Sequence, residues 1–247
     1  MSAPAPPQRV RDWLLGQEAL LRLLGSARSE DRLAHAYLFV GPRGCGKTRT
    51  ALAFAQELLC QAPEGVSDAG APSRSGARAG GKAPCGTCHG CVQVARLLHP
   101  DLHLVFPATR EEAEDMSGRA TLLERYAANR YHLLEHSPSA SIGIDRIRAL
   151  KEEVAKSGLE GDRRVVIISG AGRMTEQAAQ SALKLIEEPP PDTVLILESE
   201  SLAQLLPTLV SRCQRLRLRT LPVSELIAVL EKELGQEPAQ ARLLAAL

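Results

Sequence analysis

The chain has 247 residues, a formal net charge of +1, 44% hydrophobic residues and 24% charged residues. This length can hold one α/β domain with a large core and the start of a second domain. The near-neutral charge excludes binding of nucleic acid over the whole surface, so any such contact would be local. No apolar run approaches the roughly 20 residues needed to cross a bilayer, and the N-terminus lacks a signal-peptide pattern. We therefore expect a cytoplasmic protein without membrane contact.

A glycine-rich segment follows a Pro/Ala-rich tail over residues 1–8, which we expect to be disordered. Residues 36–40 are apolar, as is typical of a buried strand, and residues 49–59 have a helical pattern. The segment between them fits G-x-x-x-x-G-K-[ST], the P-loop pattern, in which a turn and a helix N-terminus direct N–H groups at phosphate. Lys47 would reach the β- and γ-phosphates of ATP, and Thr48 would offer its hydroxyl to Mg²⁺. The predicted phosphate-binding residues are Gly41, Pro42, Arg43, Gly44, Cys45, Gly46, Lys47 and Thr48.

Three of the six cysteines form a C-x-x-C-x-x-C run at Cys85, Cys88 and Cys91. Residues 61–84 before it are rich in Gly, Ala, Ser, Pro and Arg, which predicts a flexible insertion. This cysteine spacing is typical of metal ligands and not of a disulfide framework. A tetrahedral structural Zn²⁺ needs a fourth ligand, for which His89 is one candidate donor.

Strands alternate with helices through the remainder of the chain. Strands are predicted over residues 102–106, 163–169, 193–197 and 214–219. Helices are predicted up to Leu98, over 144–154, from a Thr175 N-cap to Glu188, and over 201–210. This alternation around a P-loop predicts an α/β fold with a parallel sheet covered by helices on both faces. Residues 107–141 are charged and partly helical, with Leu122, Leu123, Tyr126 and Leu133 as candidate anchors and no assigned function.

Several segments together resemble the clamp-loader subunits of bacterial DNA polymerase III, a family of AAA+ ATPases. The segments that carry the resemblance are residues 35–48, 85–91, 99–103, 144–148, 182–190 and 206–213. The His-Pro-Asp-Leu run at 99–102 looks most like the delta-prime type. The resemblance implies an AAA+ P-loop domain over 9–220 and the beginning of a helical lid domain over 221–247. It also implies a third, helical collar domain, for which the 247 residues contain no segment.

In this family a second apolar strand ends in two acids, an Asp that holds Mg²⁺ and a Glu that orients the attacking water. The equivalent positions here are Ser169 and Gly170. Serine carries no charge and glycine offers no base, so we expect ATP to be bound but hydrolysed very slowly or not at all. Whether Mg²⁺ accompanies the nucleotide stays open at this point.

The resemblance implies roles for two further residues. Cys60 would be the fourth zinc ligand, with His89 as the competing donor. Arg212, in a Ser-Arg-Cys motif, would be an arginine finger that reaches the ATP of a neighbouring subunit, because its rigid fork matches phosphate oxygens. The alternative is a surface arginine beside a core cysteine. Cys45 and Cys213 have no partner at ligand spacing and are expected to be packing residues.

The expected function is that of a delta-prime-like subunit of the DNA polymerase III holoenzyme, which helps load the sliding clamp onto primed DNA. Its expected partners are the gamma/tau and delta loader subunits, the clamp and, through the complex, DNA. Two alternatives are an active gamma/tau-type ATPase and a zinc-containing DNA-binding adaptor with a vestigial P-loop. Ser169 and Gly170 disfavour the first alternative. An aromatic content of 3% disfavours the second, because single-strand binders stack bases on aromatic side chains.

Overall fold

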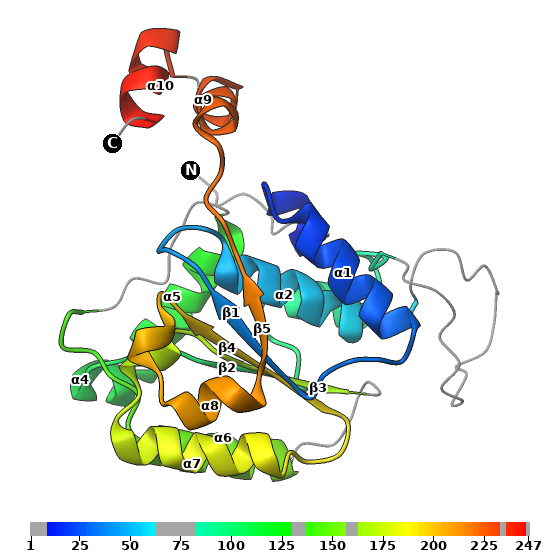
Figure 1. Ribbon diagram of the computed structural model, residues 1–247, viewed down its shortest axis with the longest axis vertical. Helices are drawn as coiled ribbons and strands as arrows, with labels where there is room; N and C mark the ends of the chain where they lie inside the picture. Colours follow the sequence, from blue (N-terminus) through cyan, green and yellow to red (C-terminus); the bar gives the residue numbers. More distant parts are fainter. Residues whose placement is uncertain (1–8, 63–82, 130–136, 157–162, 233–235, 246–247) are drawn as a thin grey trace.

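A five-stranded parallel sheet forms the centre of the molecule, with strand order β2-β3-β4-β1-β5 (Figure 1). The computed structural model describes residues 9–62, 83–129, 137–156, 163–232 and 236–245. The strands are β1 Ala36–Val40, β2 Leu102–Val105, β3 Arg164–Ile168, β4 Thr193–Ser199 and β5 Gln214–Arg217. The predicted α/β class with a parallel sheet is confirmed. The expected tail over 1–8 and residues 63–82 of the expected insertion lie outside the described residues.

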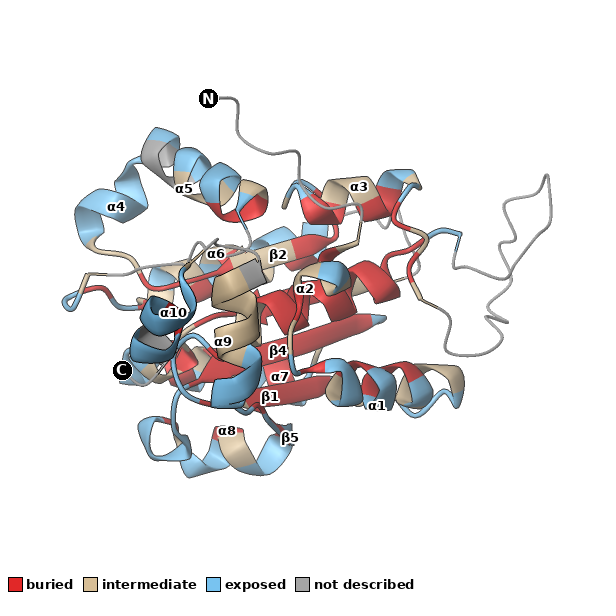
Figure 2. Ribbon diagram, turned by 90° about the horizontal axis from the view of Figure 1, so that it is seen from above, coloured by how far each residue is buried: buried red, intermediate tan, exposed pale blue. Residues whose placement is uncertain are grey.

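The central strands are buried on both faces, which explains their uninterrupted apolar sequences. All seven residues of β4 are buried, and so are the first four residues of β1, whose last residue is half-buried (Figure 2). Successive side chains point to opposite faces, so Tyr37 and Phe39 join one core cluster and Leu38 joins the other. A sheet that is apolar on both faces must be covered by helices on both sides.

Two helical layers provide this cover (Figure 1). The first consists of α1 Glu18–Ser29, α2 Lys47–Leu58 and α3 His89–Ala95, with the short 3₁₀ turn η1 Val10–Trp13. The second consists of α6 Ile144–Lys156, α7 Glu176–Glu187 and α8 Pro207–Arg212. The face predicted from the helical spacing of 144–154 is buried at Ile147, Leu150 and Val154.

The remaining elements lie at the carboxyl end of the sheet or beyond it. Helices α4 Arg110–Glu114 and α5 Met116–Ala128 occupy the charged 107–141 stretch, and the 3₁₀ turn η2 Ala171–Arg173 follows β3. Helices α9 Val223–Lys232 and α10 Pro238–Ala245 follow β5 and pack on each other (Figure 1). No helix among the described residues is both long and apolar enough to span a membrane.

Several predicted boundaries differ from the structure. Helix α3 ends at Ala95 and not at Leu98, because Leu97 adopts a left-handed φ of 59°. The single helix predicted over 201–210 is wrong. Those residues form a 3₁₀ turn, η3 Leu202–Gln204, and then α8, which begins at Pro207 because proline is favoured only in a first helical turn. The last strand ends two residues earlier than predicted. The Thr175 N-cap is confirmed, since its side chain accepts a hydrogen bond from the Ala178 N–H at 3.2 Å.

Truncation of a buried leucine in α2 tests this arrangement. Leu52 is 1% exposed against the sheet, so Leu52→Ala should lower the free energy of unfolding by about 2–5 kcal/mol through lost burial and a residual cavity. Leu23→Ala in α1 is the matched control, because Leu23 is 50% exposed and its loss should change stability by only about 0.5 kcal/mol. Urea unfolding of the three proteins measures both values. Equal losses would contradict the burial of this helix against the sheet.

Candidate nucleotide and metal sites

The P-loop turn joins β1 to α2 and has the backbone geometry that its glycines permit. Gly44 and Gly46 have left-handed φ values of 79° and 88°, where side chains are disfavoured. A Cβ on Gly41 would lie 2.6 Å from the Leu218 carbonyl oxygen, so only glycine fits beneath this turn. The helix begins at Lys47, immediately after the turn, which leaves the N–H groups of its first turn directed toward the loop.

Lys47 lies over the turn and holds its shape. Its Nζ donates to the carbonyl oxygens of Gly41 at 2.7 Å and Pro42 at 2.8 Å. An ammonium group beside a helix N-terminus provides the positive charge and the donors that phosphate oxygens require. The structure therefore brings together the P-loop residues predicted from the sequence in a geometry suited to an anion.

A buried polar cluster beneath the P-loop contains a residue that the sequence analysis missed. Thr48 Oγ1 donates to Glu198 Oε2 at 2.6 Å, and Ser169 Oγ donates to the same oxygen at 3.0 Å. The two hydroxyl oxygens are 3.3 Å apart. Glu198 is 1% exposed, and burial raises the pKa of its carboxyl above the ordinary value, although the Thr48 and Ser169 hydrogen bonds and the Lys47 charge oppose this rise. The sequence does contain a signal for Glu198, because it is an acid within an otherwise apolar strand.

Glycine is favoured at position 170 by the backbone conformation there and by the nearby Pro107 ring. Its φ of 65° is left-handed, and a Cβ there would lie 2.9 Å from the Pro107 ring. A side chain at this position would be strained by its conformation as well as by this contact. The position directly after Ser169 therefore provides a turn and no acid or base.

A cavity of about 350 Å³ opens beside the P-loop. Its walls come from the N-terminal segment, the P-loop and the start of α9, and include Trp13, Leu14, Gly44, Leu221 and Val229. Gln17 fastens two of these walls together, because its Nε2 donates to the Cys45 carbonyl at 3.1 Å and to the Arg219 carbonyl at 2.7 Å. Gln17, immediately before α1, therefore lies at the rim of the P-loop.

Arg49 connects the P-loop helix to the 107–141 stretch. Its guanidinium lies 3.7 Å from the centroid of the Tyr126 ring and 5.1 Å from that of Trp13, within cation–π range. It also donates to the backbone carbonyls of Tyr126 and Asn129, at the carboxyl end of α5. Tyr126 is buried, as expected of an anchor. The other proposed anchors, Leu122 and Leu123, are half-buried, and Leu133 lies outside the described residues.

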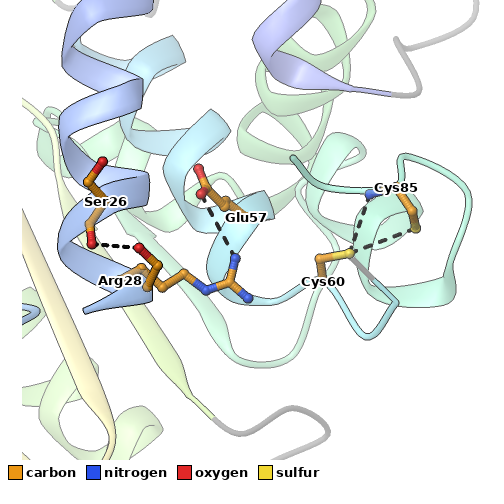
Figure 3. Close-up of polar contacts among 6 residues, drawn as sticks. Ser26, Arg28, Glu57, Cys60 and Cys85 are labelled. Carbon is orange, nitrogen blue, oxygen red and sulfur yellow. Dashed lines mark hydrogen bonds and ion pairs between the residues drawn. The ribbon is translucent and has the colours of Figure 1, made fainter. Parts of the chain in front are cut away.

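Four cysteines meet at the opposite end of α2. Cys60 Sγ lies 3.8 Å from Cys85 Sγ (Figure 3). Cys60 Sγ also lies 4.0 Å from Cys88 Sγ, and Cys85 Sγ lies 3.9 Å from Cys91 Sγ. All four sulfur atoms lie within 4.8 Å of one another. A tetrahedron with Zn–S bonds of about 2.3 Å has sulfur atoms about 3.8 Å apart. The donor set and its spacing therefore fit a structural zinc ion.

Neighbouring groups favour the charged form of one of these thiols, because the pKa of Cys88 is lowered while those of Cys60 and Cys91 are raised. The Cys91 N–H donates to Cys88 Sγ at 3.4 Å. Hydrogen bonds from the Cys60 and Cys91 thiols lower the pKa of Cys88, while the Cys88 contact raises the pKa of Cys60 to about 11. His89, the competing donor, is exposed and contacts Gln93 at 2.9 Å.

The cysteine cluster is fastened rigidly to α2. Gln56 Nε2 donates to the Cys91 carbonyl at 2.9 Å, and a Cβ on Gly90 would lie 2.5 Å from the Leu59 carbonyl oxygen. In the adjacent turn of α2, Glu57 points toward Arg28 of α1, 3.9 Å away (Figure 3). Cys45 and Cys213 are buried away from the cluster.

Arg212 lies on the surface at the end of α8. Its Nε is 2.6 Å from Glu187 Oε1, its Nη1 donates to the Thr208 carbonyl at 3.2 Å, and its side chain is 42% exposed. Glu187 belongs to the Glu-Glu-Pro-Pro run that ends α7, so two motifs distant in sequence meet here. Arg212 precedes β5, whose residue Gln214 pairs with Tyr37 near the start of β1, so it lies toward the opposite end of the sheet from the P-loop of its own chain.

The sheet order and the P-loop place the protein in the AAA+ class of P-loop folds. The solved RuvB Holliday junction branch migration motor of Thermotoga maritima matches 98% of this chain and 59% of its own chain, with a TM-score of 0.52. The sequence identity is 16%, so this similarity concerns the fold alone.

The sequence family described as DNA polymerase III, delta subunit, matches residues 16–222, and the chain belongs to this family. It is 34% identical over 230 residues to the DNA polymerase III subunit delta' of Bacillus subtilis, covering 93% of this chain and 55% of that protein. The Pseudomonas aeruginosa subunit delta' is also 34% identical, over 91% of this chain and 54% of its own length. The gamma/tau subunit of Mycobacterium tuberculosis is 29% identical over 91% of this chain and 31% of its own length. The chain thus spans about half the length of the delta' relatives.

Proposed function

We propose that this chain is the AAA+ portion of a delta-prime-type clamp-loader subunit. It would act in a complex with gamma/tau and delta subunits that loads the sliding clamp onto primed DNA. The family match and the delta' relatives support this proposal. The observation that carries it is a P-loop of full geometry beside Ser169 and Gly170, where a hydrolysing family member has two acids.

In this proposal the P-loop binds ATP. The phosphates would occupy the turn between Gly41 and Thr48, where Lys47 and the first N–H groups of α2 provide donors. The adjoining cavity, with its apolar walls and a few polar groups, suits the adenine base. Hydrolysis would be very slow, because Gly170 has no group to orient water and its φ of 65° disfavours any residue that has one.

Replacement of the P-loop lysine tests nucleotide binding. Lys47→Ala should weaken ATP binding by about tenfold or more, because a hydrogen bond to a charged group contributes about 1.5–3 kcal/mol. Titration calorimetry with ATP measures the affinity. Lys184→Ala, which removes an exposed lysine from α7, is the matched control and should bind ATP as the wild type does.

The same samples report turnover. The isolated wild-type chain should hydrolyse ATP at well below 1 s⁻¹, roughly the lower end of ordinary enzymatic rates. A rate of about 1 s⁻¹ or more would contradict the proposal and favour an active gamma/tau-type subunit.

We further propose that the four-cysteine cluster holds a structural Zn²⁺ through Cys60, Cys85, Cys88 and Cys91. The sulfur spacing and the exposed position of His89 support this ligand set. Four thiolates leave no open coordination position, so the ion would be structural and not catalytic. It would link the end of α2 to the start of α3.

Metal analysis of cysteine variants tests the ligand set. Wild-type protein should contain stoichiometric zinc, and Cys60→Ala should lose most of it while becoming less stable, because a three-ligand site binds more weakly and exposes the ion. Cys213→Ala, at a buried cysteine outside the cluster, should retain full zinc. Elemental analysis after dialysis measures the content. Stoichiometric zinc in Cys60→Ala would reject Cys60 as a ligand.

Arg212 is proposed to act on ATP bound by a neighbouring subunit. Its exposure, its position away from the P-loop of its own chain and the Glu187 contact that fixes its orientation support this role. A guanidinium is suited to it because it is always charged and donates in a rigid fork.

An arginine-to-alanine change in the assembled complex tests this role. Arg212→Ala should leave assembly intact and slow hydrolysis at the adjoining subunit's site by about 10³-fold or more, the range measured for arginine fingers. ATPase assays of the complex reconstituted with gamma/tau and delta subunits measure the loss of that site's turnover. Arg215→Ala, an exposed arginine on β5, is the control. Unchanged hydrolysis with Arg212→Ala would show that this arginine is only a surface residue.

A further inference from the structure

A buried carboxylate lies at the end of β4, directly beneath the P-loop. Glu198 is 1% exposed, and both hydrogen bonds that it accepts, from Thr48 and Ser169, go to Oε2. Its other oxygen, Oε1, is buried and has no hydrogen-bond partner among the residues that the structure describes. Buried charges in proteins are paired, or they coordinate metal ions. A buried carboxylate with only one hydrogen-bonded oxygen therefore requires an explanation.

Strand register explains how this carboxylate reaches the P-loop. Strands β3 and β4 are parallel, with Ile168 beside Leu197, so the next residues along, Ser169 and Glu198, lie side by side. Both side chains point to the face that α2 covers, and Thr48 in the first turn of α2 lies above them. A carboxylate on β4 therefore occupies the space that an Asp at position 169 would fill from the adjacent strand.

We propose that Glu198 supplies, from β4, the carboxylate that is missing at Ser169, and that with Thr48 it holds the Mg²⁺ of a bound Mg·ATP. This inference rests on the proposed nucleotide binding. It assigns Glu198 to cation binding alone and not to activation of water.

The composition of the cluster suits this ion. Mg²⁺ is bound by one or two carboxylates together with water and substrate phosphates, and its ligands are oxygen atoms. The described residues provide one carboxylate and two hydroxyls within 3.3 Å of one another, next to the loop that would hold the phosphates. The positive charge that stabilises the ionised Glu198 carboxylate is that of Lys47. The Lys47 Nζ already donates to the Gly41 and Pro42 carbonyls. A divalent cation would add the remaining charge compensation.

A purely structural role for Glu198 makes a different prediction. In that case the carboxylate only ties Thr48 to Ser169, and its loss would lower stability without changing how Mg²⁺ affects nucleotide binding. The ratio of ATP affinities with and without Mg²⁺ therefore distinguishes the two roles, and it does not depend on hydrolysis.

The experiment measures ATP binding by calorimetry in excess Mg²⁺ and in EDTA for the wild type and three variants. Glu198→Gln keeps the size of the side chain and removes its charge. The double variant Ser169→Asp/Glu198→Ala returns the acid to β3. Glu200→Gln, at an exposed acid two residues further on, is the matched control. Thermal melting verifies that each variant is folded, and Mn²⁺ electron paramagnetic resonance with ATP observes the cation directly.

We expect Mg²⁺ to strengthen ATP binding by the wild type and the control by about tenfold or more, the effect typical of groups that support a metal site. Glu198→Gln should lose this enhancement while retaining its affinity in EDTA, and the double variant should regain it. An unchanged enhancement in Glu198→Gln, or none regained by a folded double variant, would overturn the inference while leaving the P-loop proposal intact. A wild type that binds no ATP in either buffer would overturn both.

Discussion

Helix α2 is buried along nearly its whole length, and both candidate sites depend on where this burial fixes its ends. Residues Arg49 to Leu58 are all buried, and apolar ones among them pack against the sheet in the core cluster that contains Tyr37 and Phe39. A helix enclosed in this way cannot slide or rotate without opening cavities in a close-packed core. Its first residue therefore has a fixed position relative to the P-loop turn, and Cys60, just after its end, has a fixed position relative to the other three cysteines. The candidate nucleotide and metal sites, about three helical turns apart, thus share one rigid support.

The polar side chains of α2 extend this support without weakening the core. Gln56 accepts a hydrogen bond from the Val10 N–H at 2.9 Å and donates one to the Cys91 carbonyl. It therefore satisfies one backbone group of η1 and one of α3. Arg49 performs a similar function at the other end, where its planar charge stacks on Tyr126 and caps the carbonyls at the end of α5. Each of these long side chains is costly to bury alone but is hydrogen-bonded here. They attach the cysteine module and the 107–141 stretch to the same helix.

Local patterns in the sequence predicted most of the fold, because apolar strands, a Thr N-cap and the P-loop spacing act over short distances. The P-loop and the cysteine set could be identified because their residue types are restricted by chemistry. Glu198 was visible only as an acid in an apolar strand, and its significance was missed because it arises from a register that aligns it with Ser169 across two strands separated by a helix. The pairing of Arg212 with Glu187 was hidden for the same reason. The break between η3 and α8 was missed although Pro207 marks it, because the apolar spacing of 201–210 continues across the proline.

In the proposed nucleotide site, two functions that adjacent residues combine in a hydrolysing site would be separated. One acid beside the P-loop holds the cation, and the next residue along the same strand orients water. Here the only carboxylate that contacts Thr48 among the described residues comes from β4, and the residue after Ser169 is a glycine whose left-handed backbone and contact with Pro107 disfavour a side chain. Restoring an Asp at position 169 would therefore return a cation ligand without returning a base. In the proposed site, nucleotide would be bound without turnover, because the carboxylate that would hold the cation lies on β4 while Gly170, at the position that orients water, has no side chain.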